Sequence, residues 1–469
     1  LMGNDLNTAK QKSVTIYAIE EQLADVSLTR VQRRDPEKTY NKKLVNEMTA
    51  LTPDFNWQNF LSGVGTPNSE YIIIDNPKFF SKMNELLNTK SLEEWKVFLQ
   101  YSVIAGGAPF LSNDFVNENF DFSEKTVKGT KEIKPRWKRV LQTVDGLMGQ
   151  PLGQLYCDQV FKPETKQRCL TMVNNLGVAL KDRIKKLDWM SAETKEKAQL
   201  KLSLIMNKIG YPDKWRDYSA LTIDRSSYYN NVRLASAFSF QYMINKIGKP
   251  VDKTEWLMSP PTVNAYYNPT LNEIVFPAGI LQPPFYNSLA DDAVNYGGIG
   301  AVIGHELTHG FDDEGRQFDA YGNLKNWWTK EDSARFMSKT QTVVHQFNNY
   351  TVLDTMHVNG ELTLGENIAD LGGIVIAYEA FKMSLEGKVK PMPIDGFTAE
   401  QRFFIGWAQV WRNNIRDEEM RRRLIVDPHS PGKLRCNGPL SNLPEFYEAF
   451  GVKPGDKMYR APEDRARIW

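Results

Sequence analysis

The chain has 469 residues, of which 41% are hydrophobic and 25% are charged, the composition of an ordinary folded protein. Its 58 Lys and Arg residues are balanced by 57 Asp and Glu residues, so the net charge of +1 provides no field that would attract nucleic acid. No apolar run approaches the ~18 residues that a membrane-spanning helix needs. A chain of this length is too long to fold around a single hydrophobic core, so the length predicts two domains or lobes.

The first half of the sequence predicts mainly helices. Apolar residues at three- and four-residue spacing indicate an amphipathic helix over Thr15–Leu28. Further helical patterns run onward from Ser91 and over residues 135–160, 173–187 and 191–209. The three cysteines are Cys157, Cys169 and Cys436. This odd, low count excludes a disulfide framework, although a single bridge stays compatible with it.

The pattern changes near Pro250. Aromatic and β-branched residues mixed with turn signals predict a hairpin or two short strands over Tyr266–Phe276. Helices are predicted at 301–309, from Gly365 towards Phe381, and at 399–415. The sequence therefore predicts an α+β fold that is mainly α, with a helical lobe at 1–230 and a catalytic lobe at 231–469.

Residues 301–309 carry the pattern His-Glu-x-x-His. On a helix, His305 and His309 project from one face, and two imidazoles placed in this way bind one divalent cation, usually zinc. Glu306 points to the side, where it is placed to take a proton from water. The chain has only five histidines, so this spacing is not expected by chance. The short pattern alone still leaves open a helix with two incidental histidines.

The third zinc ligand should be a carboxylate or another histidine. One large class places a histidine six residues after His309, but Gly315 stands there. Glu366 and Asp370 lie four apart on an apolar helical stretch, and burying both would be costly without a cation. We therefore predict Glu366 as a ligand and Asp370 as the hydrogen-bond partner of a ligand histidine, with one Zn²⁺ per chain. An acidic pair at a helix N-terminus is the other interpretation, and it explains Asp370 poorly.

Longer strings surround these residues. They are Gly304–Asp313, Gly365–Asp370, Val263–Tyr267, Ile274–Phe285 and His429–Gly432, with weaker ones at Arg34–Pro36 and Pro135–Arg139. Together they resemble the neprilysin and endothelin-converting-enzyme family of zinc endopeptidases, over essentially the whole chain. The resemblance implies a helical lobe and a thermolysin-like zinc catalytic lobe.

The resemblance also implies roles for single residues. Glu306 would act as the general base beside the zinc ion. His429 would donate a hydrogen bond to the negatively charged oxygen of the tetrahedral intermediate. From the sequence alone, an exposed surface histidine is an equally good interpretation of His429.

Substrate contacts follow from the same comparison of motifs. Asn264 and Ala265 would hold an extended peptide by main-chain hydrogen bonds, and Arg435 would hold a substrate carbonyl. The side chains expected around the residue after the cleaved bond are Ile280, Phe285, Val302, Val410 and Trp411. They predict a large hydrophobic residue at that substrate position, although the sequence alone also fits a plain core for all five.

Family members carry a further N-terminal stretch, so we expect either a separate N-terminal chain or a fragment. The scarcity of cysteine, with Ala466 where animal members have a cysteine, indicates the bacterial branch and an extracytoplasmic location, periplasmic or secreted. The expected partners are peptide substrates, without nucleic acid and without a membrane span in this chain.

Two functions are compatible with these motifs. The first is a zinc-dependent endopeptidase that cleaves oligopeptides before a large hydrophobic residue. The alternative is a catalytically silent binding protein that has kept the peptidase fold. Because a silent homologue would usually have lost Glu306 or a ligand, the sequence favours the enzyme.

Overall fold

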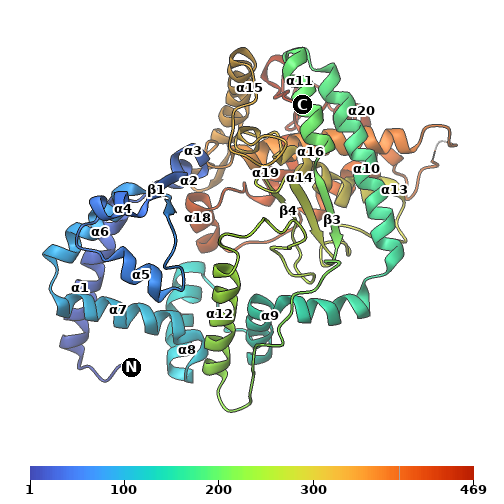
Figure 1. Ribbon diagram of the computed structural model, residues 1–469. Helices are drawn as coiled ribbons and strands as arrows, with labels where there is room; N and C mark the ends of the chain where they lie inside the picture. Colours follow the sequence, from blue (N-terminus) through green and yellow to red (C-terminus); the bar gives the residue numbers. More distant parts are fainter. Residues whose placement is uncertain (390) are drawn as a thin grey trace. The chain divides into compact units, whose positions relative to one another are not determined.

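The computed structural model describes residues 1–389 and 391–469, and its contacts divide them into two compact units (Figure 1). The first unit comprises Leu1–Thr143 and Asp217–Val251, and the second comprises Val144–Arg216 and Asp252–Trp469. A single boundary near residue 230 therefore does not describe the packing. Residues 144–216 instead share one hydrophobic core with the C-terminal half of the chain.

The first unit consists of helices and one pair of antiparallel strands. Its elements are α1 (Leu6–Asp25), α2 (Arg30–Arg34), α3 (Pro36–Thr39), β1 (Asn41–Leu44), α4 (Val45–Leu51), α5 (Trp57–Gly63), β2 (Tyr71–Ile74), α6 (Pro77–Thr89), α7 (Leu92–Gly107), α8 (Asn113–Phe120) and α12 (Tyr228–Ile244). The helix expected from Ser91 is confirmed, because the Ser91 hydroxyl and the Glu94 side chain form a capping box at the start of α7.

Helix α9 (Arg136–Val160) runs from the first unit into the second. Met148 has non-helical backbone angles, which divide α9 into two helical pieces. Pro151 lies three residues further on, inside the helix. A proline there removes one backbone N–H and crowds the preceding turn, which accounts for the kink.

The second unit contains the larger core. Its helices are α10 (Pro163–Lys186), α11 (Ala192–Ser203), α13 (Asp292–Asn295), α14 (Ala301–His309), α15 (Lys330–Asn348), α16 (Leu364–Ser384), α17 (Ala399–Val410), α18 (Asp417–Val426), α19 (Gly432–Leu440) and α20 (Pro444–Phe450). Its strands are β3 (Met206–Gly210), β4 (Tyr266–Asn268), β5 (Glu273–Pro277), β6 (Thr351–Leu353) and β7 (Met356–His357). The mainly helical fold with a small β component is thus confirmed.

The three-stranded sheet has the order β3-β5-β4, with β3 parallel and β4 antiparallel to β5. The hairpin expected over Tyr266–Phe276 is confirmed as β4 and β5. The helix expected over 191–209 ends at Ser203, because the residues that follow form β3 and pair with β5. The helix expected over 399–415 likewise ends early, at Val410.

Helices α14 and α16 approach each other closely through two glycines. A Cβ atom on Gly304 would lie 2.5 Å from the backbone oxygen of Gly373. A Cβ atom on Gly373 would lie 2.5 Å from the backbone nitrogen of His305. Only residues without a side chain permit this contact. The glycine pair therefore sets the separation between the helix that carries His305 and the helix that carries Glu366.

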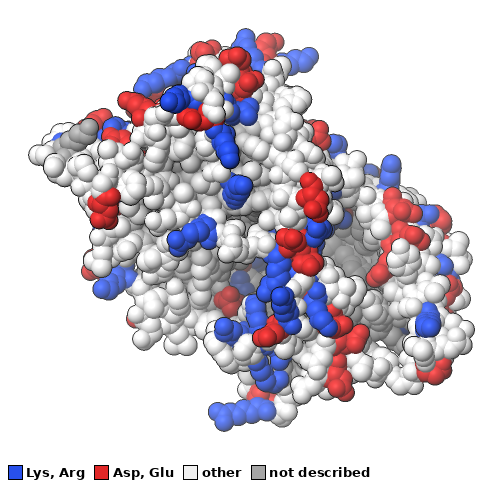
Figure 2. Space-filling view, turned by 180° about the vertical axis from the view of Figure 1, so that it is seen from behind, with Lys and Arg blue, Asp and Glu red and all other residues white. Residues whose placement is uncertain are grey.

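Positive and negative side chains are interspersed on the face drawn in Figure 2, as the nearly balanced charge predicts. Over the described residues, no helix combines the length and the apolar composition that crossing a bilayer would require. Cys157, Cys169 and Cys436 are buried and free, so the single bridge left open by the sequence does not form.

Candidate active site

Helix α14 presents His305 and His309 on one face, as their spacing predicts. Their Nε2 atoms lie 3.0 Å apart, and the two ring planes are inclined at 86°. The helix follows directly on a π-helical segment, Tyr296–Gly300. Such segments often occur near functional sites because they shift the face that the next turn presents.

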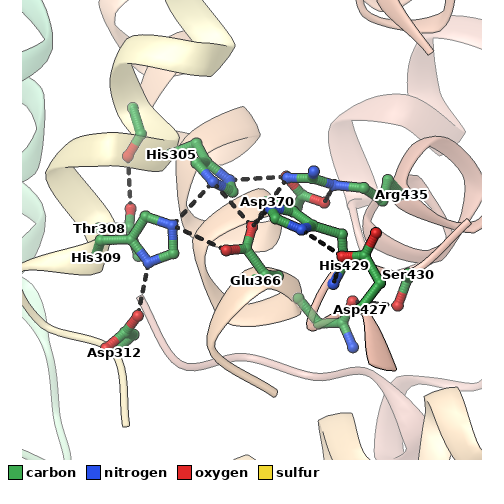
Figure 3. Close-up of polar contacts among 12 residues, drawn as sticks. His305, Thr308, His309, Asp312, Glu366, Asp370, Asp427, His429, Ser430 and Arg435 are labelled. Atoms are coloured by element: carbon green, nitrogen blue, oxygen red, sulfur yellow. Dashed lines mark hydrogen bonds and ion pairs between the residues drawn. The ribbon is translucent and has the colours of Figure 1, made fainter. Parts of the chain in front are cut away.

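Glu366, in the first turn of α16, points at both imidazoles (Figure 3). Its Oε2 lies 3.3 Å from His305 Nε2, and its Oε1 lies 3.6 Å from His309 Nε2. Two imidazole nitrogens and one carboxylate oxygen converging in this way form a donor set that suits zinc. The structure thus brings together the three residues predicted as ligands.

A carboxylate faces the outer ring nitrogen of each of these histidines. Asp370 Oδ1 lies 2.8 Å from His305 Nδ1, at an angle that departs from a regular hydrogen bond. Asp312 Oδ2 lies 2.7 Å from His309 Nδ1. Carboxylates behind metal-binding histidines fix the ring orientation and the tautomer that leaves Nε2 for the metal. The residues present therefore fit a zinc ion.

The electrostatics of the cluster also favour a cation. Burial disfavours the charged form of His309, but the charge of Glu366 and the hydrogen bond to Asp312 raise the pKa of His309 to about 10. Burial similarly disfavours the charged form of Glu366, yet the charge of His309 and the hydrogen bond from His305 hold its pKa well below the usual value. The raised pKa of His309 reflects the carboxylates gathered around it, and the lowered pKa of Glu366 keeps that carboxylate ionised. A divalent cation would neutralise this negative charge.

Glu306 is 5% exposed and lines the same cavity as the three ligands. Burial is the main cause that raises the pKa of its carboxyl group. A carboxylate with a raised pKa accepts a proton more readily and can return it later in a reaction. Its place and environment suit a general base.

His429 lies at the edge of the cluster, in the loop between α18 and α19. Its Nε2 is 3.2 Å from Glu366 Oε2, and its side chain is 46% exposed. Asp427 Oδ1 accepts hydrogen bonds from both the Nδ1 and the backbone nitrogen of His429, at 2.8 and 3.0 Å. His429 therefore belongs to the site rather than to a remote surface.

Arg435 was expected to hold a substrate carbonyl, and in the structure most of its guanidinium group binds carboxylates. Its Nε and Nη2 donate to the two carboxylate oxygens of Asp370 at 2.7 and 2.8 Å. Nη2 also lies 3.3 Å from Glu366 Oε2. Two of the three guanidinium nitrogens thus bind the carboxylates of α16.

A cavity of about 440 Å³ opens over the cluster. The cavity is lined by seven of the residues that were predicted to contact substrate: Asn264, Ala265, Ile280, Phe285, Val302, Trp411 and Arg435. Val410 is not among its lining residues and packs against the hydrophobic core. Trp407, to which the sequence motifs assigned no substrate contact, lines the cavity instead.

Sequence reasoning assigned no role to Asp312 or Asp427. Each lies close in sequence to a histidine of the site: Asp312 three residues after His309, and Asp427 two residues before His429. At that spacing, a turn of the backbone lets the carboxylate contact the histidine ring. The spacing is therefore the signal that would have identified both residues.

Comparison with known proteins agrees with this geometry. Peptidase family M13 matches residues 264–466, and its N-terminal part matches residues 1–212. The endothelin-converting enzyme homolog of Locusta migratoria is 35% identical over 489 residues, a match that covers 100% of this chain and 67% of the relative. The chain belongs to peptidase family M13.

Other relatives support the same assignment. Human endothelin-converting enzyme 1 is 36% identical over 485 residues, and this M13 chain, matched in full, spans 62% of its length. The crystal structure of Mycobacterium tuberculosis zinc metalloprotease Zmp1 with an inhibitor superposes with a TM-score of 0.96 at 42% identity, covering 100% of this chain and 72% of that one. PepO from Lactobacillus rhamnosis gives a TM-score of 0.90 at 29% identity, with coverage of 100% and 72%.

These matches confirm the predicted family and the zinc metallopeptidase class. A separate N-terminal chain was one of two alternatives that the sequence left open, and nothing in these matches supports it.

Proposed function

We propose that this M13 chain is a zinc-dependent endopeptidase that cleaves oligopeptides before a large hydrophobic residue. The convergence of His305, His309 and Glu366 beside Glu306 in one cavity carries the proposal. Family membership supports zinc as the ion, and the one donor cluster found among the described residues supports one ion per chain.

The reaction needs a nucleophile and a proton carrier. When bound by the two imidazoles and Glu366, zinc supplies a Lewis acid that polarises a carbonyl and lowers the pKa of water. Glu306 accepts the proton of the attacking water and delivers it to the departing amine. Its raised pKa suits both transfers.

Charge develops on the carbonyl oxygen as the carbonyl carbon becomes tetrahedral. His429 donates to this oxygen from Nε2, while Asp427 accepts from Nδ1 and keeps the ring turned towards Glu366. A donor already in place where charge develops lowers the barrier because it does not have to reorganise during the reaction.

The substrate backbone binds as an added strand. Asn264 and Ala265 directly precede β4, which is an edge strand of the sheet β3-β5-β4. An edge strand offers unpaired main-chain donors and acceptors to an extended peptide. Arg435 Nη1, which has no hydrogen bond among the described residues, is the group left to hold a substrate carbonyl.

The side chain after the cleaved bond enters the apolar end of the cavity. The residues that support this preference are Ile280, Phe285, Val302, Trp407 and Trp411. Large apolar walls favour a large apolar occupant, because its burial removes more surface from water.

We also propose an extracytoplasmic, bacterial setting. The scarcity of cysteine and the 42% identity with the mycobacterial metalloprotease support it. Cell fractionation of the source organism would test this setting, and recovery of the protein in the cytoplasm alone would contradict it.

Zinc analysis combined with peptide cleavage tests the function. We expect stoichiometric zinc in both the wild type and Glu306→Gln, with turnover abolished in the variant alone. Two matched peptides, with Phe or Asp after the cleaved bond, would show the side-chain preference. Equal turnover in Glu306→Gln would exclude Glu306 as the base. A zinc-loaded wild type that cleaves no peptide would favour the silent binding protein.

A further inference from the structure

A buried hydrogen bond outside the catalytic set ties the loop of His429 to helix α16. The Oγ of Ser430 donates to the Oδ1 of Asn367 at 2.8 Å. The two residues are 4% and 1% exposed. Asn367 directly follows Glu366 in α16, and Ser430 directly follows His429 in the loop. The bond therefore joins the immediate neighbours of two residues of the site.

The direction of this bond is fixed by two further hydrogen bonds. The Nδ2 of Asn367 donates to Thr363 Oγ1 at 2.9 Å, and Thr363 Oγ1 donates to the carbonyl of Asn359 at 2.9 Å. Because the Thr363 hydroxyl uses its proton on that carbonyl, it can only accept from Asn367. The Asn367 amide must then turn its oxygen towards Ser430.

His429 requires such an anchor because, apart from Glu366 Oε2 at 3.2 Å from Nε2, its polar contacts stay within its own loop. Its side chain is 46% exposed, and its position depends on the loop between Val426 and Gly432. The hydrogen bonds from His429 to Asp427 stay within this loop. They orient the ring relative to the loop, but they do not place the loop relative to Glu366. The Ser430–Asn367 bond makes that second connection.

We infer that Asn367 and Ser430 are positioning residues that hold His429 at a fixed place relative to Glu366. The inference rests on the proposed function, in which His429 contacts the reacting oxygen. Because the anchor lies on the residue next to Glu366, movements of α16 carry the metal ligand and the oxyanion donor together. Their spacing is thereby kept constant.

A double-mutant cycle separates this role from simple packing. We expect Ser430→Ala to lower kcat roughly tenfold or more with little change in KM, since small misplacements of a catalytic group cost up to ~100-fold. In the His429→Gln background, Ser430→Ala should cause no further loss. Equal losses in both backgrounds would overturn the inference. Asn367→Ala repeats the test from the other side of the bond.

A spectroscopic measurement tests the position of His429 without relying on turnover. The zinc-loaded protein, labelled with ¹³C at the histidine ring, has only five histidine signals, and His429→Gln identifies the signal of His429. We expect Ser430→Ala to shift or broaden the His429 signal and to leave those of His345 and His357 unchanged. An unchanged His429 signal would contradict the inference.

Ser441→Ala is the matched control. Ser441 is 6% exposed, and its hydroxyl donates to Gly438 at 2.8 Å, so the variant also loses a buried serine hydrogen bond. It should lower Tm as Ser430→Ala does, without changing kcat or the His429 signal. If the wild type cleaves no peptide, the proposed function fails, while the histidine spectrum still decides the positioning role.

Discussion

Asp370 and Arg435 form a buried bidentate ion pair, with Nε to Oδ2 at 2.7 Å and Nη2 to Oδ1 at 2.8 Å. The same Oδ1 lies 2.8 Å from His305 Nδ1, so one carboxylate joins α14, α16 and α19. The guanidinium also lies over the ring of Trp411, 4.1 Å from its centroid. Asp370 thus connects a zinc ligand to the wall of the substrate cavity.

Asp370→Asn should weaken zinc binding. Loss of a carboxylate behind a ligand histidine typically lowers metal affinity about 10- to 100-fold, and here the buried Arg435 also loses its bidentate charged partner. Competition with a zinc chelator measures this affinity. Asp332→Asn is the control, because Asp332 is 0% exposed and joins α15 to Ser191 at the start of α11. It should lower Tm without changing zinc affinity, and equal zinc affinities in the two variants would contradict the prediction.

Gly304→Ala should disrupt the crossing of α14 and α16. The added Cβ would lie 2.5 Å from the Gly373 carbonyl oxygen, so the helices must separate, and His305 moves away from Glu366. We expect a lower Tm and weaker zinc binding. Gly177→Ala in α10 is the matched control, since a Cβ there meets nothing within 4 Å. Replacing a glycine inside a helix by alanine should stabilise that variant by about 0.5–1 kcal/mol. Equal thermal shifts in the two variants would exclude the glycine contact as the cause.

The metal cluster was predictable because its geometry is mostly local. A helix fixes the relation of His305 to His309, and the paired carboxylates of Glu366 and Asp370 are conspicuous in an apolar helix. The folded chain only had to bring the two helices together. The glycines that allow this close contact are present in the sequence, but their partners are not evident from it.

Other features depend on tertiary contacts that local patterns do not reveal. Met206–Gly210 continues a helical pattern and becomes β3 only because it pairs with β5. The rotation of α17 about its axis decides whether Val410 or Trp407 lines the cavity. Similarly, Asp427 reaches His429 only through the conformation of their loop.

Removing zinc should lower Tm reversibly. A ligand that binds only the folded state stabilises it by about 4 kcal/mol at a thousandfold excess over Kd. Chelation should therefore shift the unfolding transition down, and added Zn²⁺ should restore it. His305→Ala provides the control, because a variant without one ligand should show little response to the chelator. If the chelator lowers the Tm of His305→Ala as much as that of the wild type, the stabilising ion binds at another site.

Lys201 should stabilise the loop that follows α14. This lysine of α11 is 0% exposed, and its Nζ donates to the carbonyls of Gly315 and Phe318, both at 2.7 Å. The same loop carries Asp312, the partner of His309. Lys201→Met leaves two carbonyls unpaired, each at a cost of about 1–3 kcal/mol. We expect a lower Tm and weaker zinc binding, and Lys197→Met on the exposed side of α11 should change neither.

The contribution of Lys201 should also depend on pH. Burial lowers the pKa of this lysine from 10.5 to about 7, in spite of the charges of Asp312 and Asp319. Between these two values the unfolded chain binds more protons than the folded one, so stability rises with pH in that window. The Tm advantage of the wild type over Lys201→Met should therefore grow from pH 7 to pH 10, whereas Lys197→Met should show no such trend. A difference that stays constant or shrinks over this range would show that folding does not lower the pKa of Lys201.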